Sequence, residues 1–163
     1  MRLKGLFVLL VSAALATVAS AQTKISGTLQ CAKPGLSQAV EVGDEPGHVI
    51  TLAKVGCTWS KTFEMAGSAS RDGYSIATGE VRSGKSTESG IHAGTMANGD
   101  KYFVRFRGNG TAAKDGSGSM DGTWSFTGGT GKLKGLTGKG TYKTTTMADG
   151  TGTAQVEGDY KTP

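Results

Sequence analysis

Residues 79–86, Gly-Glu-Val-Arg-Ser-Gly-Lys-Ser, match the Walker A pattern G-x-x-x-x-G-K-S letter by letter. That motif binds phosphates only where it follows a buried strand and begins a helix, whose N-terminal N–H groups surround the phosphate oxygens. The residues that follow, 87–94, have no helical pattern, and no apolar run ending in Asp supplies a magnesium ligand. We therefore interpret the match as accidental and predict a turn at Gly84-Lys85.

The two histidines, His48 and His92, have the side-chain type best suited to acid–base or metal chemistry near neutral pH. With Asp44 and the two cysteines they would offer the ligand types of a metal site. The histidines lie far apart in the sequence, however, and neither has a second His two residues away. We favour a structural or surface role for His48, and still more for His92, and expect neither a metal nor a cofactor.

Charged and aromatic residues within the expected strands are the remaining candidates. Glu80 and Arg105 occupy mid-strand positions from which they face either an interior or water, and the sequence pattern does not decide between these. A carboxylate facing an interior would have a raised pKa and could act as an acid or a base. No G-x-S-x-G elbow is present, so no catalytic residue is assigned. The candidates for lining a cavity are His48, Glu80, Arg105, Trp59 and Trp124.

The chain contains two cysteines, Cys31 and Cys57. In an oxidising compartment an isolated pair most often forms a disulfide, and we predict one here. Two free thiols, or a metal site shared with His48, are the alternatives.

The N-terminus has the features of a secretory signal peptide. Arg2 and Lys4 precede an apolar run, and Ala19-Ser20-Ala21 fits the rule for cleavage before Gln22. We predict that residues 1–21 are removed and that the protein is secreted or periplasmic. No stable membrane insertion is expected after cleavage.

The charge balance is mildly basic, with 18 Lys and Arg against 13 Asp and Glu. The longest basic cluster is separated by Gly and Thr, and a solvated strand face explains it better than a phosphate-binding stripe. Its members are Lys132, Lys134, Lys139 and Lys143. We therefore expect no nucleic-acid partner.

Strands are the elements that must position these residues. The chain has 27 glycines and few large aliphatic residues, which excludes a helix bundle and raises the question of disorder. Short segments nevertheless alternate with a period of two and stop at Gly, Asn-Gly or Asp-Gly. The expected strands are 24–30, 38–43, 48–55, 57–66, 73–82, 88–97, 101–108, 118–127, 138–147 and 152–160, with 48–55 and 57–66 forming one bent strand as an alternative.

Short turns between these strands make neighbours antiparallel. Asn98-Gly99 predicts a type I′ turn with two positive φ values, and Asp149-Gly150 marks a second hairpin. Many antiparallel strands in one domain form a sandwich or a closed barrel, and glycines within strands favour the barrel because they permit bulges and coiling. We predict an all-β fold, a single antiparallel barrel of about eight strands over residues 22–163.

Residues 127–142, TGGTGKLKGLTGKGTY, form the most distinctive segment. Its spacing does not fit a dinucleotide fingerprint, and we predict a tight turn that directs Leu133 and Leu136 inward. The segment resembles the glycine-rich signature near the end of allene oxide cyclase and dirigent barrels, and the ending of small secreted bacterial proteins of unassigned function. From this resemblance we expect an architectural role only for four glycines: Gly129, Gly131, Gly135 and Gly138.

Three functional hypotheses follow. The first is a non-catalytic barrel that holds a small hydrophobic or amphipathic ligand. The second, implied by the resemblance, is a cyclase- or dirigent-like enzyme that steers a reactive hydrophobic intermediate. The third is an envelope interaction protein with a filled barrel. An apolar cavity favours the first, a buried carboxylate or Arg facing it favours the second, and solid packing favours the third. Dirigent-like barrels associate, so the resemblance leaves a homo-oligomer open.

Overall fold

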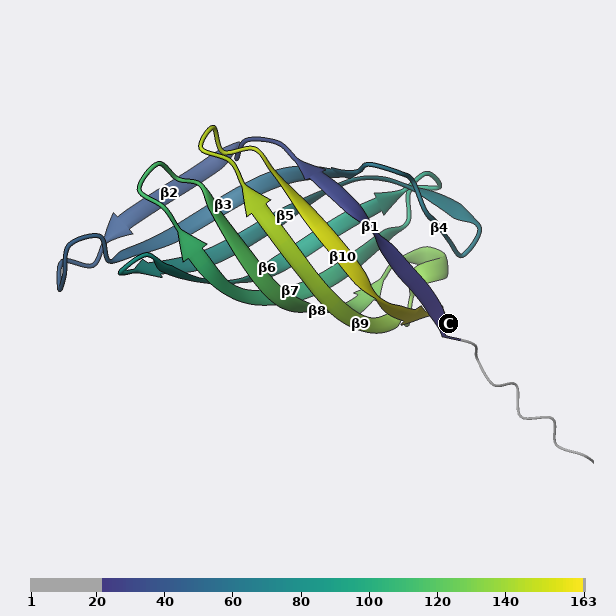
Figure 1. Ribbon diagram of the computed structural model, residues 1–163. Coiled ribbons are helices and arrows are strands. Elements are labelled where there is room, and N and C mark those ends of the chain that lie inside the picture. Colours follow the sequence, from purple (N-terminus) through teal and green to yellow (C-terminus); the bar gives the residue numbers. More distant parts are fainter. Residues whose placement is uncertain (1–21, 163) are drawn as a thin grey trace, which may run out of the picture.

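The computed structural model describes residues 22–162, and the predicted signal peptide at 1–21 lies outside the described residues. Within them the chain forms a ten-stranded sheet and one short 3-10 helix (Figure 1). The elements are β1 (Thr23–Cys31), β2 (Leu36–Glu41), β3 (Val49–Trp59), β4 (Glu64–Met65), β5 (Ser68–Arg82), β6 (Lys85–Met96), β7 (Lys101–Ala112), β8 (Gly118–Gly129), η1 (Gly131–Leu133), β9 (Thr137–Thr146) and β10 (Gly152–Lys161). No helix in the described part of the chain is long and apolar enough to cross a membrane.

Eight of the strands form a closed antiparallel barrel, as the sequence predicts. Hydrogen bonding runs in the order β3-β1-β10-β9-β8-β7-β6-β5, and the pairing of β5 with β3 closes the ring. β3 is a single strand over Val49–Trp59, so 48–55 and the first residues of 57–66 are joined as in the alternative, while 60–63 are not strand and Glu64–Met65 form β4. The barrel therefore has an inside and an outside, and alternate residues of each strand face one or the other.

The barrel is closed by a short seam between β1 and β3. Only three residue pairs join these strands, from Leu29 opposite Trp59 to Cys31 opposite Cys57. The last pair is bonded covalently, so the predicted disulfide is confirmed. Beyond Cys31 the chain bends and β2 continues the pairing along β3. β2 has no partner on its other side, and all six of its residues are exposed.

The two ends of the barrel differ. β4 and η1 lie at the end where the chain terminates (Figure 1), and they cover it with buried side chains. The largest fully buried side chains are Met65, Met96, Leu133 and Leu136. The opposite end carries the hairpin turns 83–84, 113–117 and 147–151 and has no such cover. The inward positions predicted for Leu133 and Leu136 are confirmed.

Large rings lie inside the barrel because glycines on neighbouring strands leave room for them. Trp124 on β8 is in register with Gly140 on β9, which is in register with Gly158 on β10. A Cβ atom added at Gly140 or Gly158 would lie 2.7 or 2.5 Å from the Trp124 ring. The ring therefore lies across two strands, and its Nε1 donates to the carbonyls of Thr141 and Glu157, each at 3.1 Å. The low aliphatic content is thus compensated by a few rings packed on glycine backbone.

The predicted type I′ turn at Asn98-Gly99 is wrong, because Asn98 keeps a negative φ and only Gly99 is positive, at 88°. The Asn98 side chain accepts a hydrogen bond from the Asp100 N–H at 3.0 Å, which stabilises a three-residue loop. The same arrangement recurs in the other two long hairpins, where Asp115 accepts from Ser117 and Asp149 from Thr151.

The Walker A match lies on a β-hairpin. β5 ends at Arg82, Ser83 and Gly84 form the turn with φ values of 51° and 74°, and β6 begins at Lys85. The turn is one residue earlier than predicted. With no helix after the glycine, the segment lacks the N–H groups that would hold a phosphate.

The glycine-rich segment has the architectural role that was predicted for it. Gly131 has a φ of 52°, which other residues adopt only with strain, and a Cβ there would collide with the Asp100 carboxylate. That carboxylate also accepts the Lys132 N–H at 3.1 Å. The other three positions, Gly129, Gly135 and Gly138, are either crowded or at positive φ.

Candidate functional site

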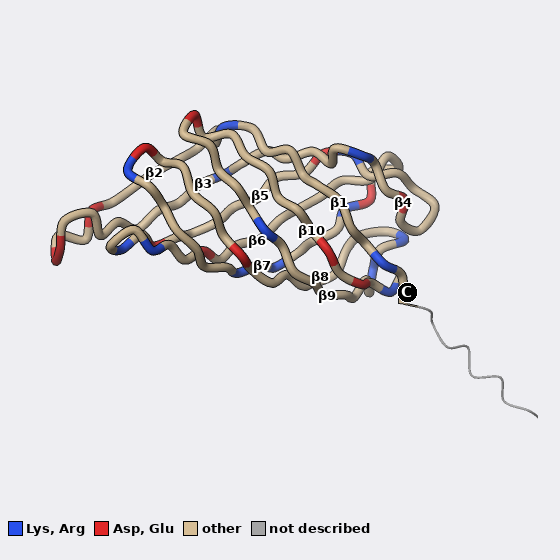
Figure 2. Tube along the Cα trace, viewed as in Figure 1, with Lys and Arg blue, Asp and Glu red and all other residues tan. Residues whose placement is uncertain are grey.

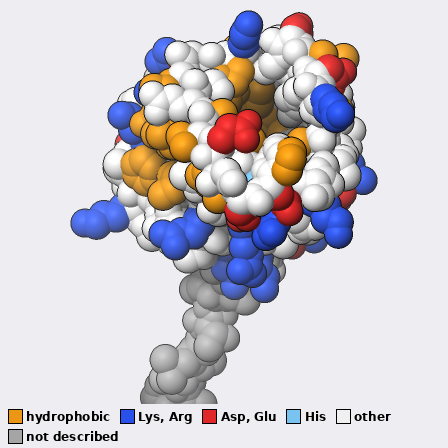
Figure 3. Space-filling model, turned by 90° about the vertical axis from the view of Figure 1, so that its left-hand side faces the viewer, with side chains coloured by type: hydrophobic (Ala, Val, Ile, Leu, Met, Phe, Trp, Pro, Cys, Tyr) orange, Lys and Arg blue, Asp and Glu red, His pale blue; other side chains and the backbone are white. Residues whose placement is uncertain are grey.

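The barrel encloses a lumen of about 390 Å³ that opens at the uncovered end. Figure 3 looks onto this end and shows it hollowed, with hydrophobic side chains inside. Small residues line the outer part, among them Ala53, Ala77 and Ala154. Aromatic rings line the deeper part: Trp59, Tyr102, Phe106, Trp124, Phe126 and Tyr142. Of the candidate residues, Trp59 and Trp124 line this lumen.

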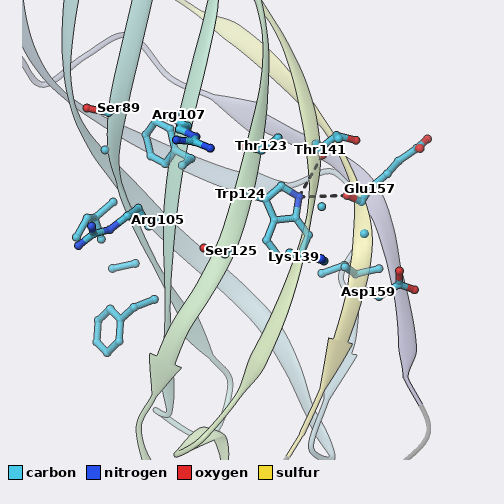
Figure 4. Close-up of a pocket in the computed structure, with 18 of the residues that line it drawn as sticks. Ser89, Arg105, Arg107, Thr123, Trp124, Ser125, Lys139, Thr141, Glu157 and Asp159 are labelled. Atoms are coloured by element: carbon cyan, nitrogen blue, oxygen red, sulfur yellow. Dashed lines mark hydrogen bonds between the residues drawn. The ribbon is translucent and has the colours of Figure 1, made fainter.

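A broader depression, of about 1630 Å³, lies on the outer wall and extends across seven strands. Figure 4 shows Arg105, Arg107, Lys139, Glu157 and Asp159 around it, with serine and threonine side chains between them. Its charged and hydroxyl side chains stand at outward positions, where water reaches them. The lumen is smaller, but walls surround it on all sides except the mouth, so it is the better candidate for enclosing a small molecule.

Three of the five candidate cavity residues, His48, Glu80 and Arg105, do not line the lumen, and Arg105 lines the outer depression instead. Arg105 is paired with Ile91 and Ser125, and Glu80 with Ile50, all at outward positions. The sequence left the facing of Glu80 and Arg105 open because these strands carry polar residues on both faces, so alternation alone does not show which face is inside.

Glu88 is the carboxylate inside the barrel, on β6, and sequence reasoning missed it. It is in register with Gly108 on β7, Gly122 on β8 and Tyr142 on β9. The two glycines leave a trough across which the Tyr142 ring reaches the carboxylate, and its hydroxyl donates to Glu88 Oε1 at 2.7 Å. Burial raises the pKa of Glu88, and the hydrogen bond from Tyr142 partly offsets this. These four residues, Glu88, Gly108, Gly122 and Tyr142, form a row across four strands, and the row can be identified only when the strand register is known.

His92 faces the same lumen, four residues deeper along β6. Its Nδ1 is 3.0 Å from Ser75 Oγ, and its ring lies against the backbone of Gly73. Burial lowers the pKa of His92 to about 4, so the imidazole is neutral at pH 7. Below it, Trp59 Nε1 donates to the Tyr102 hydroxyl at 3.1 Å. The deep lumen is therefore uncharged.

His48 belongs to a separate cluster at the mouth end, outside the lumen. Its Nδ1 is 2.5 Å from Asp44 Oδ1 and its Nε2 is 2.9 Å from Glu80 Oε1. Next to them, Arg82 Nε donates to Glu45 Oε1 at 2.9 Å. These contacts attach the β2–β3 loop to the end of β5. His48 and His92 thus have different partners, and in the described residues no group of three His, Cys, Asp or Glu side chains is placed to hold a metal ion.

The His48 contacts predict a pH-dependent contribution to stability. The hydrogen bond to Asp44, and then that to Glu80, raise the pKa of His48 above 6.5 despite partial desolvation. Protonation therefore favours the folded state. The contribution is fully present below pH 6.5, while the carboxylates stay ionised, and is lost as the pH rises through the folded pKa. Urea unfolding of the wild type and His48→Gln should show a wild-type advantage that shrinks from pH 6 to pH 9. His92 is common to both proteins and cancels, so an advantage that grows with pH would contradict the prediction.

Charges on the outer wall are interspersed rather than gathered by sign (Figure 2). Lys24 pairs with Asp159 at 2.7 Å and Lys143 with Asp121 at 3.3 Å, both across neighbouring strands. Pairs of this kind are typical of solvated strand faces.

Comparison with known proteins supports the fold alone. No family model and no curated protein matches the chain. Among solved structures, the chain is similar to RPA1785 from Rhodopseudomonas palustris, described as a conserved protein of unknown function. The TM-score is 0.50 at 9% identity, over 85% of this chain and 98% of that one. The chain is thus a β-barrel similar in fold to a protein that is itself described as of unknown function.

Proposed function

We propose that the protein is a secreted or periplasmic barrel that holds a small hydrophobic or amphipathic ligand in its lumen. The lumen carries this proposal, since it is apolar, deep and open at one end only. Such cavities hold ligands by excluding water from apolar surface, with a few polar groups that fix orientation. The Cys31–Cys57 disulfide is compatible with an extracellular or periplasmic location. Solid packing, which the filled-barrel hypothesis requires, is not found.

A matched pair of substitutions on β5 tests where the ligand binds. Ala77 lines the lumen, and the next residue, Thr78, faces outward into the wall depression. Titration with the neutral fluorophore N-phenyl-1-naphthylamine should give saturable enhancement in the wild type. Ala77→Phe should weaken it at least tenfold by filling the lumen, whereas Thr78→Phe should leave it unchanged.

The reverse result would place binding in the outer depression, and no saturable binding by the wild type would refute ligand holding in the lumen. Circular dichroism of both variants checks that the barrel is intact. Native mass spectrometry of protein from its own host would then give the mass of any natural ligand.

The buried carboxyl group of Glu88 supports a second candidate, an enzyme of the cyclase or dirigent kind that the glycine-rich segment suggests. Under this hypothesis Glu88 would exchange a proton with a reactive intermediate held among the rings. Incubating the natural ligand with the wild type and with Glu88→Gln separates the candidates. Conversion by the wild type alone supports the enzyme, and an unchanged ligand with both proteins supports simple holding.

A further inference from the structure

The ionisable side chains that line the lumen can supply negative charge at neutral pH but no positive charge. Among the described residues that line it, only Glu88 and His92 have side chains that titrate at a lower pH than tyrosine does. None of these lining residues is Lys or Arg. His92 is neutral at pH 7. The only full charge that the lumen wall can carry at neutral pH is therefore the negative charge of Glu88, and no cation among the lining residues offsets it.

Glu88 is also open to an incoming group. Tyr142 occupies Oε1, and no described side chain or backbone group bonds the second carboxyl oxygen. Because every fully buried side-chain N or O atom of the described chain has a partner, this unpartnered oxygen must be accessible from the lumen. The carboxyl group thus presents one free acceptor to whatever fills the cavity.

Two aromatic rings lie in the same part of the lumen as this carboxyl group. The Phe106 ring lies over Gly90, which is two residues from Glu88 on the same face of β6, and a Cβ at Gly90 would lie 2.6 Å from it. The Tyr142 hydroxyl bonds the carboxyl group itself, and the Phe106 and Tyr142 rings meet edge to face with centroids 5.9 Å apart. Ring faces and a carboxylate around one position are the groups that attract an organic cation.

On the basis of the proposed function, we propose that the lumen selects a small organic ammonium ion with an apolar body, and that Glu88 is its counter-ion. The ammonium group contacts the free oxygen of Glu88 beside Phe106 and Tyr142. The apolar body fills the lumen among the remaining rings.

The charge inventory also disfavours the other head groups. An anionic amphiphile, such as a fatty acid, would place a second negative charge beside Glu88 with no cation in the lining to pair with it. A neutral alcohol would gain one hydrogen bond but no ion pair. Bound ammonium, in contrast, stabilises the ionised carboxylate that burial disfavours.

Three ligands with the same chain and different head groups test the proposal. n-Octylamine, n-octanol and n-octanoate are cationic, neutral and anionic at pH 8, and each is titrated into the intact barrel by isothermal calorimetry. The amine should bind at least tenfold more tightly than the alcohol, and octanoate more weakly than both. Lowering the pH through the pKa of Glu88 should reduce the ratio of amine to alcohol affinity, a readout that needs no substitution.

Glu88→Gln should make the amine and alcohol affinities similar while octanol binding persists, which shows that the lumen is intact. Glu157→Gln is the matched control, because it removes a carboxylate of the outer depression and leaves the lumen lining unchanged, so it should retain the preference for the amine. Binding of octanol or octanoate at least as tight as octylamine would overturn the ammonium proposal and leave ligand holding in place. Binding of none of the three would overturn both.

Discussion

Replacing Trp124 with Ala should lower the free energy of unfolding by about 3–5 kcal/mol, the range typical of buried Trp-to-Ala changes. The Trp124 ring lies over the backbone of Gly140 and Gly158, which have no side chains to move into the space. It also meets Phe126 edge to face at 5.2 Å. The substitution would therefore leave three strands without the apolar group that covers their inner face.

Urea unfolding followed by circular dichroism measures this effect. Trp124→Phe is the matched control, since it keeps one six-membered ring and loses the indole N–H and the second ring, and it should therefore cost less than Trp124→Ala. A midpoint for Trp124→Ala indistinguishable from that of the wild type would show that the glycine trough does not depend on the ring.

Removing the disulfide with Cys31→Ser and Cys57→Ser should lower the free energy of unfolding by about 3 kcal/mol, because the bond restricts the unfolded chain. The two residues are 26 positions apart and lie opposite each other in the seam. Without the bond, three residue pairs and flanking backbone hydrogen bonds hold β1 against β3. The barrel should then open first at this seam.

Hydrogen exchange locates the change as well as measuring it. The Ala32 and Ser60 amides, which bond across the seam to Gly56 and Thr28, should exchange faster in the double variant. Amides between β7 and β8, on the far side of the ring, should change only as much as global stability does. Equal acceleration at both places would contradict preferential opening at the seam.

Much of the architecture is encoded locally. Strand period, turn residues and strand glycines specify an antiparallel barrel, and the isolated cysteine pair specifies the bond across its seam. The conformation of the Asn98-Gly99 loop was harder to predict, because the choice between two turn types depends on the hydrogen bond from the Asp100 N–H to the Asn98 side chain.

The candidate site was less predictable because it depends on register. Glu88 and Tyr142 are 54 positions apart, and they meet only because Gly108 and Gly122 lie between them on neighbouring strands. A shift of one residue in any pairing would break this row. Arg105 illustrates why the sequence left such positions open, since a mid-strand charge has the same local sequence pattern whether it faces a lumen or water.

The rings that lie across glycines have a consequence for how sequences with this barrel can diverge. Neither member of the pair formed by Trp124 and Gly140 can change alone, because a smaller ring leaves a void and a larger residue at 140 meets the indole. Aligned relatives should therefore show correlated substitution at positions 124 and 140, and at 88 and 142 wherever the ligand differs. Such correlated positions in an alignment would show which residues lie opposite each other on neighbouring strands.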